Sequence, residues 1–318
     1  MNCRRSATVT VSTFRYLFKL ILYRLLVSLV TIGLAVAIIL PLISYVIHSE
    51  ELKTLLTTGK DLFSNLFTGK DLSPFSEKLV AGVGDLWLLI VSKKINLAFV
   101  FLGIIVMVFA NIFLRGLASY VYGIAVNDYM STLSDFGFFH CFFRNLKSAC
   151  LYQLVYALIK MVYYVVAVAL LFFLFTEMLA TISLVAFPIT YLFAVLVFAL
   201  FHTLFCGMLP ATVVGEKRVG DAFKISLRQV KNKKRFGSVF ASQIYFIVCS
   251  TVLVSAFGVF TFGLGFIVMP IVCNMWEVSL SFAHYYAFND KKFYLHYDNI
   301  VVPKALRKEE SLLNQMEL

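Results

Sequence analysis

Three ionisable side chains stand inside apolar runs that are long enough to cross a membrane. They are Lys160, His202 and Glu277. A charge in the hydrocarbon region costs free energy, so each of them is a hypothesis for function. Counted along helices at about 1.5 Å per residue, all three fall in the half of the membrane nearest the cytoplasm. Asn274 lies one turn from Glu277 on the same side of its helix, and it completes a candidate intramembrane polar cluster.

Three interpretations of this cluster are open. In the first, Lys160 and Glu277 pair near His202, so that each charge offsets the desolvation of the other and the pair holds helices together. In the second, the same groups line a path for a solute or a proton. In the third, Lys160 extends to the inner headgroups and touches neither residue. The structural pairing is the interpretation that we favour.

A basic amphipathic helix in segment 210–235 is the second candidate surface. Its apolar stripe comprises Val219, Ala222, Phe223, Leu227 and Val230. Its cations recur on another face at near-helical spacing, at Lys217, Lys224, Arg228, Lys231 and Arg235. We expect this helix to rest on the anionic lipid of the inner leaflet. Docking of a cytoplasmic partner is the alternative.

Motifs of known enzyme classes are missing from the sequence. HExxH, GxSxG and a Walker A loop do not occur, and no pair of intramembrane Asp residues indicates an aspartyl protease. The five letters TGKDL occur twice, at Thr58–Leu62 and Thr68–Leu72, but neither copy fits GxxxxGK[ST]. The six cysteines are dispersed without a CxxC pair, which argues against zinc. We therefore assign no catalytic residue and expect no cofactor and no metal.

Composition indicates the class of protein that must position these residues. Hydrophobic residues make up 61% of the 318 residues and charged residues 14%. A soluble domain is about half apolar and about a quarter charged, so this chain needs lipid as its solvent. The net charge of +11 comes from cations at the ends of apolar runs. That distribution indicates membrane topology and anionic lipid contact, not nucleic acid.

Six apolar runs predict an all-α integral membrane bundle. Each run is long enough to cross a hydrocarbon core about 30 Å thick as a helix. The predicted spans are Leu25–Ile47, Ile95–Leu114, Leu151–Phe175, Ile182–Leu209, Phe236–Val259 and Phe266–Phe288. The predicted organisation is a cytoplasmic N-terminal segment 1–24, a six-span membrane domain 25–288 and a cytoplasmic tail 289–318.

Charge bias predicts the orientation. Segment 1–24 has five basic residues and no acid, and segment 210–235 has eight basic residues against two acids. The loop 48–94 is balanced, with six lysines and six acids. The positive-inside rule therefore places both termini in the cytoplasm of a cell with the protein in its plasma membrane. Loop 48–94 is expected outside, as two or three amphipathic helices on the membrane face, or alternatively as a ligand-binding cap.

The stretch VVGEKRVGDAFKISLRQVKNKKRFGSVFASQIYFIV, at Val213–Val248, carries a family resemblance. A glycine, the Ala222, Phe223 and Ser226 positions, a basic run and a following span make up the pattern. It resembles bacterial multi-pass membrane proteins of unknown function, related to the membrane domain that precedes some glycerophosphodiester phosphodiesterases. The resemblance covers about a tenth of the chain. It implies about six helices and no assigned activity, and it carries over no catalytic residue.

These observations favour one function over two others. We expect a noncatalytic component that assists or anchors a membrane assembly, with a membrane-protein partner or a second copy of the chain. The alternative is a small-solute transporter or permease that uses the intramembrane polar cluster. A transporter signature of paired broken helices with polar midplane residues is missing, however. A membrane-embedded lipid-modifying enzyme is the least favoured reading.

Overall fold

The computed structural model describes residues 2–46, 49–68, 73–92, 97–134, 137–181, 185–296 and 299–303. Within these residues, six helical segments are long and apolar enough to cross a membrane. The predicted all-α membrane bundle is therefore confirmed. The candidate spans are Phe14–Ile38, Phe101–Thr132, Leu146–Leu179, Ala186–Val213, Lys233–Phe260 and Gly265–Phe288.

Two of the spanning helices are longer than the sequence predicts. Helix α5 (Leu97–Thr132) and helix α7 (Leu146–Thr181) each contain 36 residues, which is about 54 Å of helix. Even at a tilt of 40° such a helix covers about 41 Å along the bilayer normal, more than the hydrocarbon core of about 30 Å. Both helices therefore extend past the core and carry side chains outside it.

The chain divides into two compact units. The first comprises residues 1–26, 113–157 and 198–318, and the second comprises residues 27–112 and 158–197. Helix α2 (Leu17–Val46), α5, α7 and helix α8 (Ala186–Phe205) each begin in one unit and end in the other.

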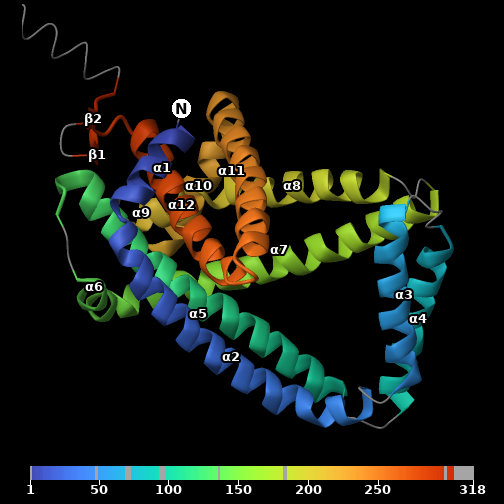
Figure 1. Ribbon diagram of the computed structural model, residues 1–318. Coiled ribbons are helices and arrows are strands. Elements are labelled where there is room, and N and C mark those ends of the chain that lie inside the picture. The colour runs from blue at the N-terminus through green and yellow to red at the C-terminus, as the bar shows by residue number, and fades with distance from the viewer. Residues whose placement is uncertain are drawn as a thin grey trace, which may run out of the picture. The chain divides into compact units, whose positions relative to one another are not determined.

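The first unit contains most of the shorter elements (Figure 1). Helix α11 follows directly after helix α10, and α11 and α12 pack side by side as a hairpin. The bounds are α1 (Asn2–Ser12), the 3₁₀ turn η1 (Phe14–Tyr16), α6 (Phe138–Arg144), α9 (Met208–Val213), α10 (Val219–Lys231), α11 (Lys233–Phe260) and α12 (Gly265–Phe288). Two short strands, β1 (Phe293–His296) and β2 (Asn299–Val301), follow and pair antiparallel, with Phe293 opposite Val301.

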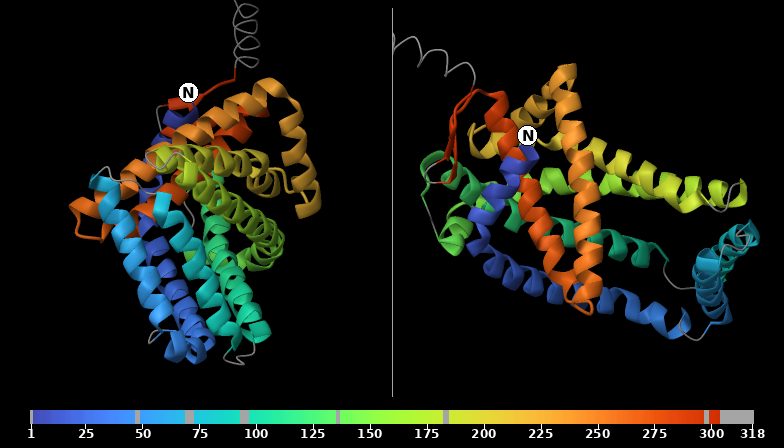
Figure 2. Two further views of the ribbon diagram at one scale, coloured as in Figure 1. Left: turned by 90° about the vertical axis from the view of Figure 1, so that its right-hand side faces the viewer. Right: turned by 45° about the horizontal axis from the view of Figure 1, so that its top comes forward.

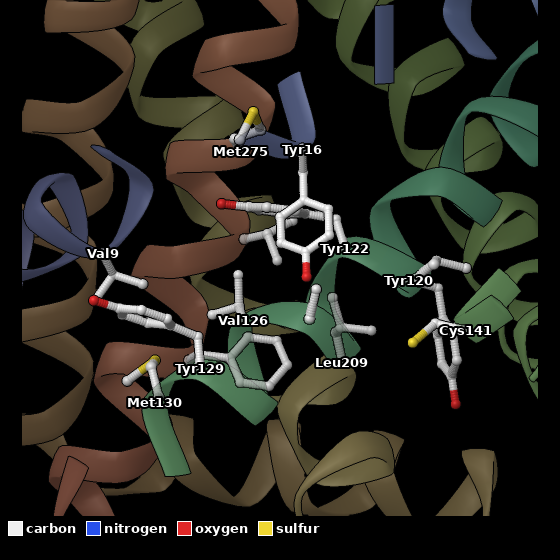
Figure 3. Packing of buried hydrophobic residues seen from close by; sticks show 14 of the residues in the cluster. Val9, Tyr16, Tyr120, Tyr122, Val126, Tyr129, Met130, Cys141, Leu209 and Met275 are labelled. Carbon is white, nitrogen blue, oxygen red and sulfur yellow. The ribbon is translucent and has the colours of Figure 1, made fainter. Parts of the chain in front are cut away.

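Aromatic side chains from distant parts of the sequence form the core of the first unit. Tyr16, Tyr122 and Phe138 are each at most 2% exposed. The rings of Tyr16 and Tyr122 meet edge to face at 6.4 Å, the preferred geometry for aromatic pairs. Figure 3 shows Tyr16 beside Tyr122, with Met275 close by on α12. Burial of each such side chain contributes about 1.5–3 kcal/mol.

The N-terminal residues form a helix that packs along α12 (Figure 1). Val9 of α1 is completely buried. The Trp276 indole donates a hydrogen bond to Ser6 Oγ at 2.9 Å, and Asn2 Nδ2 lies 3.0 Å from His284 Nδ1. The basic segment that the sequence presents as a cytoplasmic extension thus contains an element of the first unit, fixed to the last spanning helix.

The second unit contains the polar loop between the first two spans. Helix α3 (Glu50–Thr68) and helix α4 (Ser73–Ser92) lie side by side in both views of Figure 2, with Leu55 against Gly82. The first TGKDL copy lies within α3, so it is helical rather than a phosphate-binding loop. Of the second copy, residues 69–72 lie outside the described residues. Leu179 and Ala186 form a small buried cluster in this unit.

Candidate intramembrane site and basic face

A histidine and a carboxylate from two spanning helices meet in the first unit. His202 Nδ1 of α8 lies 2.6 Å from Glu277 Oε1 of α12. The two side chains are 12% and 25% exposed, and the His202 ring packs edge-on against Phe201 at 5.6 Å. The contact is an ion pair when the imidazole is protonated and a hydrogen bond when it is neutral. Two of the predicted cluster residues are therefore direct partners.

Two arginines that the sequence analysis did not assign to the site belong to the same neighbourhood. Arg24 of α2 interacts electrostatically with both Arg115 of α5 and Glu277. Arg115 Nε is buried and has no hydrogen-bond partner among the described residues. Both arginines are partly buried and lie inside candidate spans. The site therefore combines two guanidinium groups with one carboxylate and one imidazole.

The two arginines were not predicted to belong to the site, because they flank the most apolar runs. Arg24 directly precedes the run that begins at Leu25, and Arg115 directly follows the run that ends at Leu114. A span that is predicted from hydropathy is given its boundary at such a cation. Apolar sequence on the far side of each arginine is the signal that could have placed it inside a helix. LFKLILY precedes Arg24, and GLASYVYGIAV follows Arg115.

Asn274 is hydrogen-bonded to another helix. Its Nδ2 donates to Ser119 Oγ of α5 at 3.0 Å, and its Oδ1 lies 3.2 Å from the same hydroxyl. Within a membrane such interhelical hydrogen bonds contribute about 0.6 kcal/mol on average. Asn274 thus acts as a tie between α5 and α12.

Two further contacts join the same helices. Tyr122 OH of α5 lies 3.3 Å from Ser279 Oγ, and Tyr286 OH donates to Asn127 Oδ1 at 2.8 Å. Together with the Ser119–Asn274 contact they form a row that we call the α5–α12 polar seam. Residue numbers rise together on both helices along the seam, so α5 and α12 run parallel. The second and sixth spans of a six-span chain must run in the same direction, and the seam agrees with this.

Lys160, the remaining predicted cluster residue, belongs to the second unit. It is partly buried on α7, and its Nζ lies 5.2 Å from the centre of the Tyr164 ring, within the range of a cation–π contact. On the same helix Tyr163 OH donates to the backbone oxygen of Val197 at 2.6 Å. The pairing of Lys160 with Glu277 stays a prediction, because the two residues lie in different units.

Helix α10 is attached to the protein through its apolar stripe. Ala222 is completely buried, and the ring of Phe223 stacks on Phe205 of α8 at 6.0 Å. Ser226 Oγ donates to the backbone oxygen of Leu204 at 2.6 Å. Residues that look suited to lipid in the sequence therefore pack against the bundle. Leu227, at 37% exposed, is the stripe residue that stays largely accessible among those whose side chains are described.

The cations of α10 and its neighbours are exposed. All five predicted contact residues are exposed: Lys217, Lys224, Arg228, Lys231 and Arg235. We call this set the basic face. Only its last member contacts a described ring, since the Arg235 guanidinium lies 5.3 Å from the centre of the Phe288 ring. Helix α10 is thus fixed to the bundle by its buried side, while its exposed charges stay available to an acidic surface.

The chain matches no protein-family model, no curated protein and no solved structure at a significant level. Its class is therefore defined by its own fold, which is that of a multi-pass, all-α membrane protein.

Proposed function

We propose that this protein is a noncatalytic component of a membrane assembly, and that it binds an acidic partner through the basic face. The observation that carries the proposal is the fixed presentation of this face. Buried Ala222 and Ser226 hold α10 on the bundle, while Lys224 and Arg228 stay exposed. A prearranged row of cations loses less conformational entropy on binding than a flexible one.

The polar groups of the spans support a structural role. His202 contacts Glu277, and Asn274 contacts Ser119. Polar side chains that hydrogen-bond across helices stabilise bundles in membranes. These contacts explain much of the predicted intramembrane polar cluster without a substrate.

The test is a brief crosslinking of native membranes followed by purification in mild detergent and mass spectrometry. The wild type is compared with Lys224→Glu/Arg228→Glu, which reverses the basic face. Arg4→Glu/Lys147→Glu is the matched control, because both are exposed cations of the first unit outside α10. We expect a stoichiometric partner that is lost with the first variant and kept with the control. Equal recovery of the partner with both variants would refute the proposal.

A second candidate function has one specific observation in its favour. Arg24, Arg115 and Glu277 place more positive than negative charge at one site within candidate spans. Such a site attracts anions where the dielectric is low. A transporter of a small anionic solute would therefore show flux in proteoliposomes that Glu277→Gln changes and Ser281→Ala leaves intact. The same flux in all three proteins would remove this candidate.

A further inference from the structure

A pocket of about 910 Å³ lies within the first unit, and neither His202 nor Glu277 is among the residues that line it. It is bounded by the last turns of α5, by α6, by the first turns of α7 and by the connection from α9 to α10. Sites for small molecules measure about 300–1,000 Å³. Its size therefore suits a ligand with a headgroup and several additional carbon atoms.

Charged side chains form part of the lining of this pocket. Arg144 from α6 and the consecutive Lys217 and Arg218 line it, against the acids Asp128 and Glu216. Asp128 interacts electrostatically with Arg144, so part of that charge is already balanced. The two cations before α10 add to the positive end of a helix dipole. The pocket is therefore suited to an anionic group with several oxygen acceptors, such as a phosphate.

Apolar and aromatic side chains form another part of the lining. The rings of Tyr120 and Tyr152 are at most 6% exposed and lie 5.3 Å apart in its wall. Val155 and Leu151 continue the wall along α7, and Leu151 is 62% exposed on the candidate span Leu146–Leu179. The apolar wall thus joins a surface that is suited to lipid. A small polar metabolite would gain no favourable contact from this apolar surface.

We propose that this pocket binds the headgroup end of an anionic phospholipid. The phosphate lies against Arg144 and Arg218, with Asn145 and Ser148 as neutral donors in the same lining. The glycerol end and the first part of the acyl chains lie along Tyr152 and Leu151. Charge complementarity selects the phosphate, and the apolar wall selects a lipid over a soluble phosphate compound. This site is distinct from the basic face, although Lys217 borders both.

The experiment measures binding of a short-chain lipid to the full-length protein in nonionic detergent by calorimetry. Dihexanoyl phosphatidylglycerol is the probe, dihexanoyl phosphatidylcholine is its zwitterionic counterpart, and glycerol 3-phosphate is the soluble counterpart. We expect the anionic lipid to bind at least about tenfold more tightly than either, since a charge-assisted hydrogen bond contributes about 1.5–3 kcal/mol.

The variants separate the pocket from general charge attraction. Arg144→Gln/Arg218→Gln removes two of the pocket cations, and Lys233→Gln/Lys234→Gln, the control pair, removes two exposed cations of α11 outside both the pocket lining and the basic face. The pocket pair is expected to weaken binding about tenfold or more, while the control pair leaves it within about twofold. Ser148→Trp fills the pocket without changing charge and is expected to abolish binding, which keeps the test valid if the arginine pair does not fold.

Three outcomes would overturn the proposal. Equal weakening by the pocket pair and the control pair would show attraction to surface charge alone. Unchanged binding in Ser148→Trp would place the lipid elsewhere. Glycerol 3-phosphate binding as tightly as the lipid would assign the pocket to a soluble phosphate compound. None of these results bears on partner capture by the basic face, because that experiment reverses Lys224 and Arg228.

Discussion

His202 and Glu277, which are 75 positions apart in the sequence, hold α8 and α12 together through a contact of 2.6 Å between Nδ1 and Oε1. Both side chains are mostly buried. A carboxylate in such a place is tolerated when it has a donor close by. The pair thus links the fourth and the sixth candidate span. Its removal should lower the stability of the first unit.

Truncation of Glu277 tests this tie. Glu277→Ala is expected to destabilise the protein by about 1–3 kcal/mol, because the buried His202 donor loses its acceptor. Thermal unfolding in detergent measures the effect. A cycle with His202→Phe and the double variant should give a coupling of about 0.5–3 kcal/mol. Strictly additive effects would mean that the pair contributes no coupling, and Ser281→Ala, on the same helix, serves as a near-neutral control.

The α5–α12 polar seam predicts which substitutions interact. Ser119→Ala and Asn274→Ala should be nonadditive, with a coupling of about 0.6 kcal/mol and at most about 1.7 kcal/mol. Tyr286→Phe, at the other end of the seam, should add to either one, because distant sites are independent. The measurement is again the unfolding midpoint of single and double variants. Additivity within the Ser119–Asn274 pair would contradict the seam.

A glycine at the approach of α5 to α7 predicts a steric effect. A Cβ at Gly116 would overlap the side-chain amide of Gln153, which is only 2% exposed. Gly116→Ala should therefore destabilise the protein by about 1–3 kcal/mol, the range of overpacked cores. Gly237→Ala in α11 is the matched control, since its Cβ meets nothing within 4 Å. There Ala should be neutral or stabilising by up to about 1 kcal/mol. The same effect at both glycines would rule out the overlap as its cause.

Docking of helix α1 on α12 predicts that the thiol of Cys3 reacts slowly with maleimide. Burial raises the pKa of Cys3 above its ordinary value, and its Sγ lies 3.6 Å from the backbone oxygen of Ser242. The thiolate is the nucleophile, so a raised pKa leaves less of it at neutral pH, and reactivity should rise only as the pH increases. With the other cysteines replaced, Cys3 should react with maleimide more slowly than a Thr8→Cys variant on the exposed side of α1. Equal rates near pH 7.5 would show that α1 is not docked.

The sequence was sufficient for the membrane class and insufficient for the length of the helices. Apolar runs predict six spans because hydropathy reports the solvent of a segment. They do not predict that α5 continues from Leu114 to Thr132, because Arg115 and the small residues after it resemble a span end. The continuation depends on packing of Tyr122, Val126 and Met130 into the core of the first unit. That packing arises between segments far apart in the sequence.

The elements at the two ends of the chain were not predicted from the sequence, for similar reasons. Helix α1, NCRRSATVTVS, contains β-branched residues that have low helix propensity. Contacts of Ser6 and Val9 with α12 and the core make up for it. The strands β1 and β2 are too short for periodicity to identify them in a polar tail. Of the predicted site, His202 and Glu277 were found and Arg24 and Arg115 were missed, because charge at the end of an apolar run was taken for its boundary.

The attachment of α1 to α12 has a consequence for biogenesis. Asn2 meets His284, 282 positions later in the chain. At a synthesis rate of about 5–20 residues per second, the nascent N-terminus waits about 14–56 s before its partner is made. The buried side of α1 must be kept from other contacts during that interval. Docking of α1 is therefore a late event that follows insertion of the final span, and a chain that ends before α12 cannot complete it.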